Sequence, residues 1–129
     1  MAALYLDTSA VGRVLLGEPD APAVLAAARE HDQHVSSRVL AVELRRLSLR
    51  HDCLADANRL LSAVALVPVT EELLEAADTV APATVATLDA IHLATALDVA
   101  SSIGLGAILT YDQRLAAGAR HHGIPVLAP

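Results

Sequence analysis

Four acidic side chains occupy positions where an ionised carboxylate is costly unless something neutralises it. Asp7 and Asp112 each follow an apolar run directly. Glu43 lies between hydrophobic neighbours in a helical stretch, and Asp89 begins a segment with few polar residues. Ionised carboxylates in such surroundings require a partner or a bound metal, and four together would repel one another without a divalent cation. Ligands that offer only oxygen suit Mg²⁺ or Mn²⁺ rather than zinc.

Each of these acids also has an ordinary structural explanation. Asp7 and Asp112 precede predicted helices, where aspartate is a common N-cap. Asp89 can interact with a helix dipole, and Glu43 can pair with Arg46 three residues later. It is the combination of the four positions that points to a metal site.

The elements that must position these acids are strands alternating with helices. Strands are expected at 4–6, 34–36, 65–69, 107–110 and 124–127, and helices at 10–16, 20–29, 37–50, 54–64, 71–80, 89–101 (starting at 87 or 88) and 113–122. Thr70 is expected to cap the helix that follows it, and Asp20 the one beginning there. This alternation predicts an α/β fold, a single-domain α/β/α sandwich with a central parallel sheet.

The strand order decides whether the acids meet. Ligands of such sheets bind at the carboxyl ends of the strands, where the order reverses. In the order 3-2-1-4-5, the first and fourth strands are neighbours, and Asp7 and Asp112 then share one crevice. Asp98 lies nine residues beyond Asp89, about half a rotation around the helix, so it is expected to face elsewhere.

Composition narrows the function. The 129 residues, 54% of them hydrophobic, suffice for one packed domain spanning 1–129. The absence of lysine excludes a phosphate-binding P-loop, and the absence of Trp and Phe excludes an aromatic platform for stacked bases. A net charge of −6 opposes binding to a polyanion unless the acids bind cations. The single cysteine fits a reducing cytoplasm, and neither a membrane span nor a leader is expected.

Four arginines are candidates for phosphate contacts. Arg46 and Arg50 continue the helical stripe that contains Glu43, at i+3 and i+7. Arg13 and Arg114 lie close in sequence to the two strand-end acids. The alternative for each is a helix-surface arginine in a weak ion pair.

The histidines invite a zinc interpretation, which the sequence does not favour. His31 and His34, like His51, lie in polar segments between elements and are expected to be solvated surface side chains. His92 lies one turn from Asp89, where it is expected either to hydrogen-bond behind the acids or to be a buried structural histidine.

Several short motifs resemble the PIN-domain family, and in particular the VapC-type toxins of bacterial toxin–antitoxin pairs. They are Leu6–Ala10, Ala41–Leu44, Leu88–Ala96 and Ile108–Asp112, in that order along the chain. The resemblance implies a parallel sandwich with the strand order given above and a Mg²⁺- or Mn²⁺-dependent endoribonuclease. It also implies a cognate antitoxin as partner and RNA as substrate. We also expect the protein to form a homodimer and not to associate with a membrane.

The resemblance also assigns roles to residues. Asp7, Glu43, Asp89 and Asp112 match the acidic quartet of the family, and Thr110 with Thr8 or Ser9 matches its polar supporting positions. We expect Asp7 and Asp89 to be the principal metal ligands and Asp112 a direct or water-mediated ligand. Glu43 is expected to act as a ligand or as the general base.

Two other functions are compatible with the sequence. The first is a PIN-like scaffold that binds RNA or protein without cutting, although the complete quartet speaks against it. The second is a phosphohydrolase of small molecules. Metal-dependent cleavage of RNA by the pure protein, or turnover of a phosphomonoester, would distinguish them.

Overall fold

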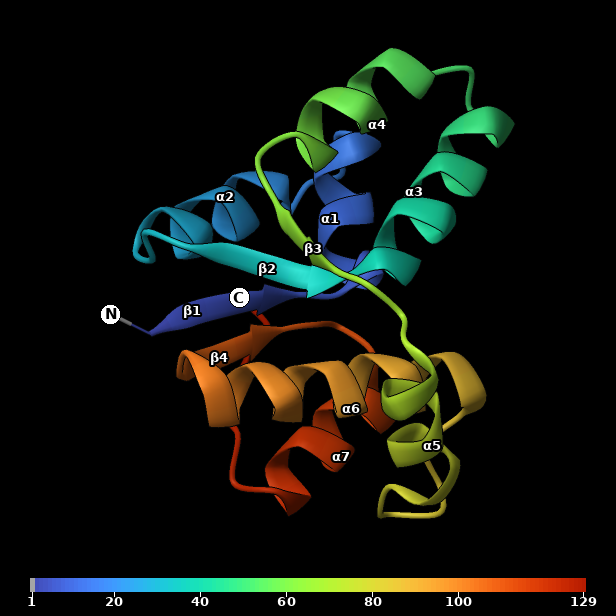
Figure 1. Ribbon diagram of the computed structural model, residues 1–129. Helices are drawn as coiled ribbons and strands as arrows, with labels where there is room; N and C mark the ends of the chain where they lie inside the picture. The colour runs from blue at the N-terminus through green and yellow to red at the C-terminus, as the bar shows by residue number, and fades with distance from the viewer. Residues whose placement is uncertain (1) are drawn as a thin grey trace.

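A five-stranded parallel sheet runs through the centre of the computed structural model, which describes residues 2–129 (Figure 1). Its strands are β1 (Ala3–Leu6), β2 (His34–Ser37), β3 (Ala65–Val67), β4 (Leu105–Leu109) and β5 (Val126–Leu127). Their spatial order is β3-β2-β1-β4-β5, and every pair is parallel. The predicted order 3-2-1-4-5 is therefore confirmed.

Seven helices in residues 2–129 cover the sheet in two layers (Figure 1). One layer contains α1 (Thr8–Leu15), α2 (Ala21–Arg29), α3 (Arg38–Arg50) and α4 (Leu54–Leu61), and the other α5 (Glu71–Thr79), α6 (Thr87–Ser102) and α7 (Gln113–His121). The fold is the predicted α/β/α sandwich. None of these helices has the length and apolar character required to cross a membrane.

The central strand β1 explains why the core has two halves. Leu4 and Leu6 pack into the cluster beneath α1 to α4, whereas Ala3 and Tyr5 pack into the cluster beneath α6 and α7. Successive side chains of a strand point to opposite faces, so a strand covered on both sides is apolar at every position. Such a strand ends where the first charged residue appears, and here that residue is Asp7.

Most of the predicted boundaries hold to within two residues, and the differences have local causes. The first helix begins at Thr8 rather than at residue 10, because Asp7 is the N-cap that accepts from the Ser9 amide. The strand predicted at 65–69 ends at Val67, since Pro68 has no amide hydrogen to continue the ladder. The helix predicted at 54–64 ends at Leu61.

One capping prediction is wrong. Asp20 stands at the N-cap position of α2, yet its side chain makes no capping hydrogen bond. Its carboxylate instead pairs with Arg13, whose Nε lies 2.7 Å from Asp20 Oδ2. The charged guanidinium is a stronger hydrogen-bond donor than a backbone amide, so the carboxylate turns toward it.

The helix α6 is less buried than its apolar sequence predicts. His92 to Ala96 are buried, but Leu88 near one end and Asp98 near the other are exposed. The reason is that α6 lies in an outer layer, where it packs on α5, α7 and the sheet and leaves its remaining face to solvent.

Candidate functional site

The carboxyl ends of β1 and β4 lie side by side and bring the first acid into the centre of the site. Leu6 pairs with Leu109 in the sheet, and the Asp7 amide donates to the Leu109 carbonyl oxygen. Asp7 is only 4% exposed. Its Oδ2 accepts hydrogen bonds from Ser9 Oγ at 2.6 Å and Thr110 Oγ1 at 2.8 Å. The predicted supporting hydroxyls thus hold this carboxylate in place.

Glu43 is held in the same way by a different pair of donors. On α3 its Oε1 lies 2.8 Å from Thr8 Oγ1 and 2.7 Å from His92 Nε2. Burial favours the neutral acid, but the hydrogen bond and positive charge of His92 and the hydroxyl of Thr8 outweigh it and lower the pKa of Glu43. The alternative pairing of Glu43 with Arg46 is not formed in residues 2–129.

Asp89 and Asp112 complete the charged cluster from two helix starts. Asp112 caps α7, where its Oδ1 accepts from the amides of Arg114 and Leu115. Asp89 lies in the first turn of α6. Its burial, together with the negative charges of Asp112 and Asp7, raises the pKa of Asp89 to about 6. Asp89 is therefore coupled electrostatically to Asp112 and Asp7, and His92 links Glu43 to this group.

Three of these carboxylates share a feature that a chance cluster of acids would lack. Every hydrogen bond to Asp7, Glu43 or Asp112 falls on one oxygen of the pair. Within residues 2–129, the only buried side-chain oxygen without a partner is Asp20 Oδ1. The second oxygens of Glu43 and Asp112 accept no hydrogen bond from residues 2–129, and Asp7 Oδ1 lies 3.7 Å from His92 Nε2.

This donor set fits a hard divalent cation. It offers only carboxylate oxygens, and donors orient three of the four acids. Burial and the repulsion from Asp112 and Asp7 raise the pKa of Asp89, and a cation would relieve that repulsion. Within residues 2–129, no three potential ligands already converge at metal-binding distance.

The histidine behind the acids is the part of the site that the sequence left open. His92 is 1% exposed and hydrogen-bonds on both ring nitrogens, to Glu43 and to the Tyr5 hydroxyl. The charges of Asp7, Glu43 and Asp89 add to the Glu43 hydrogen bond and, against the effect of burial, raise the pKa of His92. Both predicted roles hold at once, since the residue is buried and contacts the acids.

Sequence reasoning missed Tyr5. The apolar run around it predicts a core strand, and nothing local signals that the hydroxyl group reaches 87 residues along the chain to His92. One of the histidines expected to be solvated at the surface is hydrogen-bonded to the backbone instead. His34 Nε2 lies 2.7 Å from the Ala28 carbonyl oxygen. That contact closes the turn before β2 and has no connection with the acids.

The four arginines divide into two kinds. Arg46, Arg50 and Arg114 are exposed, and no ion pair engages them in residues 2–129. Arg13 is engaged on three sides: it pairs with Asp20, donates to the Ser9 carbonyl oxygen, and stacks 3.7 Å above the centre of the Tyr111 ring. It braces the segment that holds the supporting hydroxyls.

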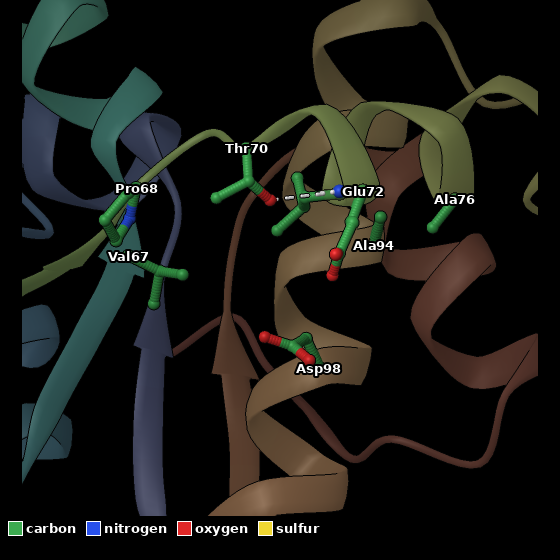
Figure 2. Close-up of a pocket in the computed structure, with 8 residues that line it drawn as sticks. Val67, Pro68, Thr70, Glu72, Ala76, Ala94 and Asp98 are labelled. Carbon is green, nitrogen blue, oxygen red and sulfur yellow. Dashed lines mark hydrogen bonds between the residues drawn. The ribbon is translucent and has the colours of Figure 1, made fainter.

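A second acidic hollow lies at the other end of α6. It is lined by residues from β3, α5 and α6, among them Glu72 and Asp98 (Figure 2). Thr70 caps α5 there by accepting from the Leu73 amide at 3.2 Å. The Glu72 and Asp98 carboxylates make no hydrogen bond with residues 2–129, so no donor orients them.

Comparison with known proteins supplies the family. A model of the PIN domain matches residues 4–121. Two curated relatives come from Mycobacterium tuberculosis. Ribonuclease VapC47 (strain CDC 1551 / Oshkosh) is 34% identical over 98% of this chain and 96% of its own length. Ribonuclease VapC46 (strain ATCC 25618 / H37Rv) is 35% identical over 100% of this chain and 99% of its own.

A solved structure agrees on the fold. A chain of a "Toxin-antitoxin complex from Klebsiella pneumoniae" superposes with a TM-score of 0.74, at 22% identity, over 99% of this chain and 98% of that chain. The sandwich, the strand order and the full-length similarity to curated relatives lead to one assignment. The protein belongs to the PIN-domain family and is a homologue of the VapC ribonucleases.

Proposed function

We propose that this protein is a ribonuclease of the VapC type, the toxin of a toxin–antitoxin pair, and that it hydrolyses RNA phosphodiester bonds. The observation that carries the proposal is the set of three carboxylates that are held by hydrogen bonds on one oxygen and make none with the other. The full-length similarity to proteins named ribonucleases supports it. A scaffold without catalytic activity would have no need to orient these oxygens.

The cofactor in this proposal is Mg²⁺ or Mn²⁺, held chiefly by Asp7 and Asp89, with Asp112 as a direct or water-mediated ligand. When bound, such an ion neutralises charge on the phosphate and makes water more acidic. Glu43 supplies a further oxygen. Because His92 and Thr8 keep its pKa low, Glu43 is suited to binding a cation and poorly suited to removing a proton.

The chain's own residues bind and orient the RNA. Arg46 and Arg50 extend from the same helix as Glu43, and Arg114 lies in the first turn of α7, directly after Asp112. Their unpaired guanidinium groups are available for bidentate contacts with phosphate oxygens. Arg13 has a bracing role here rather than the phosphate contact that its position in the sequence suggested.

The proposed partner is an antitoxin protein. Of the apolar residues in and beside the first two helices, Val24 is buried, Leu15 and Leu16 are half-buried, and Leu25 is exposed. Leu25 borders an almost entirely apolar groove formed by α1, α2 and α4. A homodimer belongs to the same proposal, and exposed Val42 and Leu49 on α3 are the apolar residues available for it.

The test compares two aspartates of one helix. We expect the pure protein to cleave RNA with Mg²⁺ or Mn²⁺ and to stop when EDTA is added. Asp89→Asn should abolish cleavage, whereas Asp98→Asn, nine residues along α6 in the other hollow, should leave it unchanged. Gel analysis of total RNA and of defined transcripts measures both.

Three outcomes would contradict the proposal. RNA binding without cleavage in either ion would favour the scaffold, and turnover of a phosphomonoester with indifference to RNA would favour a small-molecule phosphohydrolase. Cleavage that persists in EDTA, or that Asp89→Asn leaves intact, would remove the role of the carboxylates.

A further inference from the structure

A buried line of hydrogen bonds joins the core strand to the crevice. Tyr5 Oη lies 2.7 Å from His92 Nδ1, and His92 Nε2 lies 2.7 Å from Glu43 Oε1. The three residues come from β1, α6 and α3. Since α3 and α6 lie in opposite layers of the sandwich, the line connects the two layers past the edge of the sheet (Figure 1).

The direction of the last hydrogen bond follows from the chemistry of its acceptor. An ionised carboxylate has no hydrogen to donate, so Nε2 of His92 must carry the proton and donate it to Oε1. This holds whether the ring is neutral or charged. In the neutral ring the Tyr5 hydroxyl donates to Nδ1, and the Ser37 amide at 3.1 Å donates to the hydroxyl oxygen in turn.

The ring itself has little freedom. His92 is 1% exposed and packs edge-on against Tyr5, with ring centres 5.8 Å apart and planes at 87°. With both nitrogens bound, rotation about its side-chain bonds would break two hydrogen bonds in a water-free setting. The Nε2–H direction is thus set by the core.

We propose that His92 is a positioning residue, which fixes Glu43 by its Oε1 so that Oε2 points into the crevice. Thr8 Oγ1, at 2.8 Å from the same oxygen, is the second support. Glu43 needs such support because its long side chain is 25% exposed. It also projects from α3, in the layer opposite to the helix α6 that carries His92. The inference rests on the proposed function, since it assigns a role within that site.

The experiment uses two replacements of similar polarity. In His92→Gln the amide nitrogen reaches the place of Nε2 and keeps a donor to Glu43. In His92→Asn the shorter amide can meet Tyr5 but leaves Glu43 without its donor. Two measurements are made on the full chain: Mn²⁺ affinity without RNA, by electron paramagnetic resonance, and kcat and KM for RNA cleavage.

We expect His92→Asn to lower Mn²⁺ affinity and kcat by about 10- to 100-fold, the usual cost of losing a residue that orients a ligand, with KM nearly unchanged. His92→Gln should recover most of both. Ser48→Ala serves as control, because it removes a buried hydroxyl that bonds the Arg45 carbonyl oxygen on the helix of Glu43, remote from the crevice. It should lower the melting temperature without changing Mn²⁺ affinity.

A measurement without metal or RNA completes the test. The His92 Nε2–H should give a slowly exchanging proton signal in nuclear magnetic resonance, and Glu43→Ala should remove or shift it. The proposal fails if His92→Asn binds Mn²⁺ and turns over like the parent protein, or if His92→Gln is equally impaired. If the parent cuts no RNA, the proposed function fails instead, and the free-protein signal still reports the contact.

Discussion

Each end of α6 carries an aspartate, and only one of the two lies among acids that the fold holds in place. At the first end, Asp89 faces acids whose inner oxygens are held by Ser9, Thr110 and His92. At the other end, Glu72 and Asp98 line the pocket of Figure 2 with no hydrogen-bond donor to hold their carboxylates. The difference shows that oriented oxygens, rather than the number of carboxylates, distinguish a ligand set from a solvated acidic surface.

The pKa of Asp89 reflects the negative charge gathered at the first end of α6. Burial and the neighbouring charges of Asp112 and Asp7 raise the pKa of Asp89 to about 6, which records an unfavourable crowding of negative charge. The fold maintains this crowding because sheet and helix packing fix the backbone positions from which the acids project. Strain of this kind in a free protein is expected where a ligand is to be bound.

After the loss of cleavage expected for Asp89→Asn, the largest expected effect is at Asp7. Asp7→Asn should lower cleavage by about 10³-fold, because several kcal/mol of cation binding and charge stabilisation are lost. Asparagine is also a good N-cap, so α1 should remain folded. Cleavage rates at saturating Mn²⁺ measure the effect, and a variant within tenfold of the parent would contradict the central role of this acid.

The supporting hydroxyl groups give a matched pair of threonines. Thr110→Val removes a donor to Asp7 Oδ2 and should lower activity by about 10- to 100-fold. Thr70→Val removes the cap of α5 in the other hollow, which should cost about 1 kcal/mol of stability and leave cleavage unchanged. Equal effects of the two replacements on cleavage would erase the distinction between the hollows.

The exposed arginines are expected to act on substrate binding. Replacing Arg46 and Arg50 together by alanine should raise KM about fivefold at low salt and less at high salt, because exposed charges are screened. Arg59→Ala is the control, since Arg59 lies on α4 in an exposed pair with Asp56. KM measured at several salt concentrations separates the two, and an unchanged KM would exclude phosphate contacts by this stripe.

The smallest effect is on stability. The folded protein holds the proton of Asp89 more tightly than the unfolded chain, since the pKa rises from 3.8 to about 6. The contribution of Asp89 to the free energy of unfolding is therefore fully present below about pH 4 and is lost as the pH rises through about 6. Without metal at pH 7, Asp89→Asn should be more stable than the parent by ~1 kcal/mol, allowing for solvent screening.

Melting curves with EDTA at pH 4 and pH 7 check this prediction. The gain in stability of Asp89→Asn over the parent should be near zero at pH 4, where Asp89 is already neutral in the folded protein. A gain of equal size at both pH values would mean that crowding of charge is not its cause.

The acids themselves could be predicted because their signals are local. An apolar run that stops at Asp7, or a charge next to Leu44 in a helical stripe, is visible within a few residues. The strand order could also be predicted. Alternating strands and helices are compatible with few sheet topologies, and the resemblance to the PIN-domain family selected one of them. The hydroxyl groups that hold Asp7 lie within the same motifs, so Ser9 and Thr110 were found with it.

The contacts between distant segments were not accessible in this way. Arg13 was expected to meet phosphate, but α2 brings Asp20 to it and Tyr111 lies under its guanidinium group. Tyr5 looked like a core residue only, because its apolar neighbours hide a hydroxyl group that meets His92. Each pairing depends on side-chain direction across packed elements, which spacing along the chain does not encode.

The sequence by itself determined the class of fold, the two faces of each strand, and the four acids that stand at strand ends, at a helix start or within an apolar helical stripe. Periodicity and capping are properties of adjacent residues, and they suffice for this. The tertiary structure alone decided which oxygen of Glu43 is held, and it added the second hydroxyl group that holds Asp7 Oδ2. That choice is made by donors from Thr8, His92 and Thr110, whose positions are fixed only when the two helical layers close on the sheet.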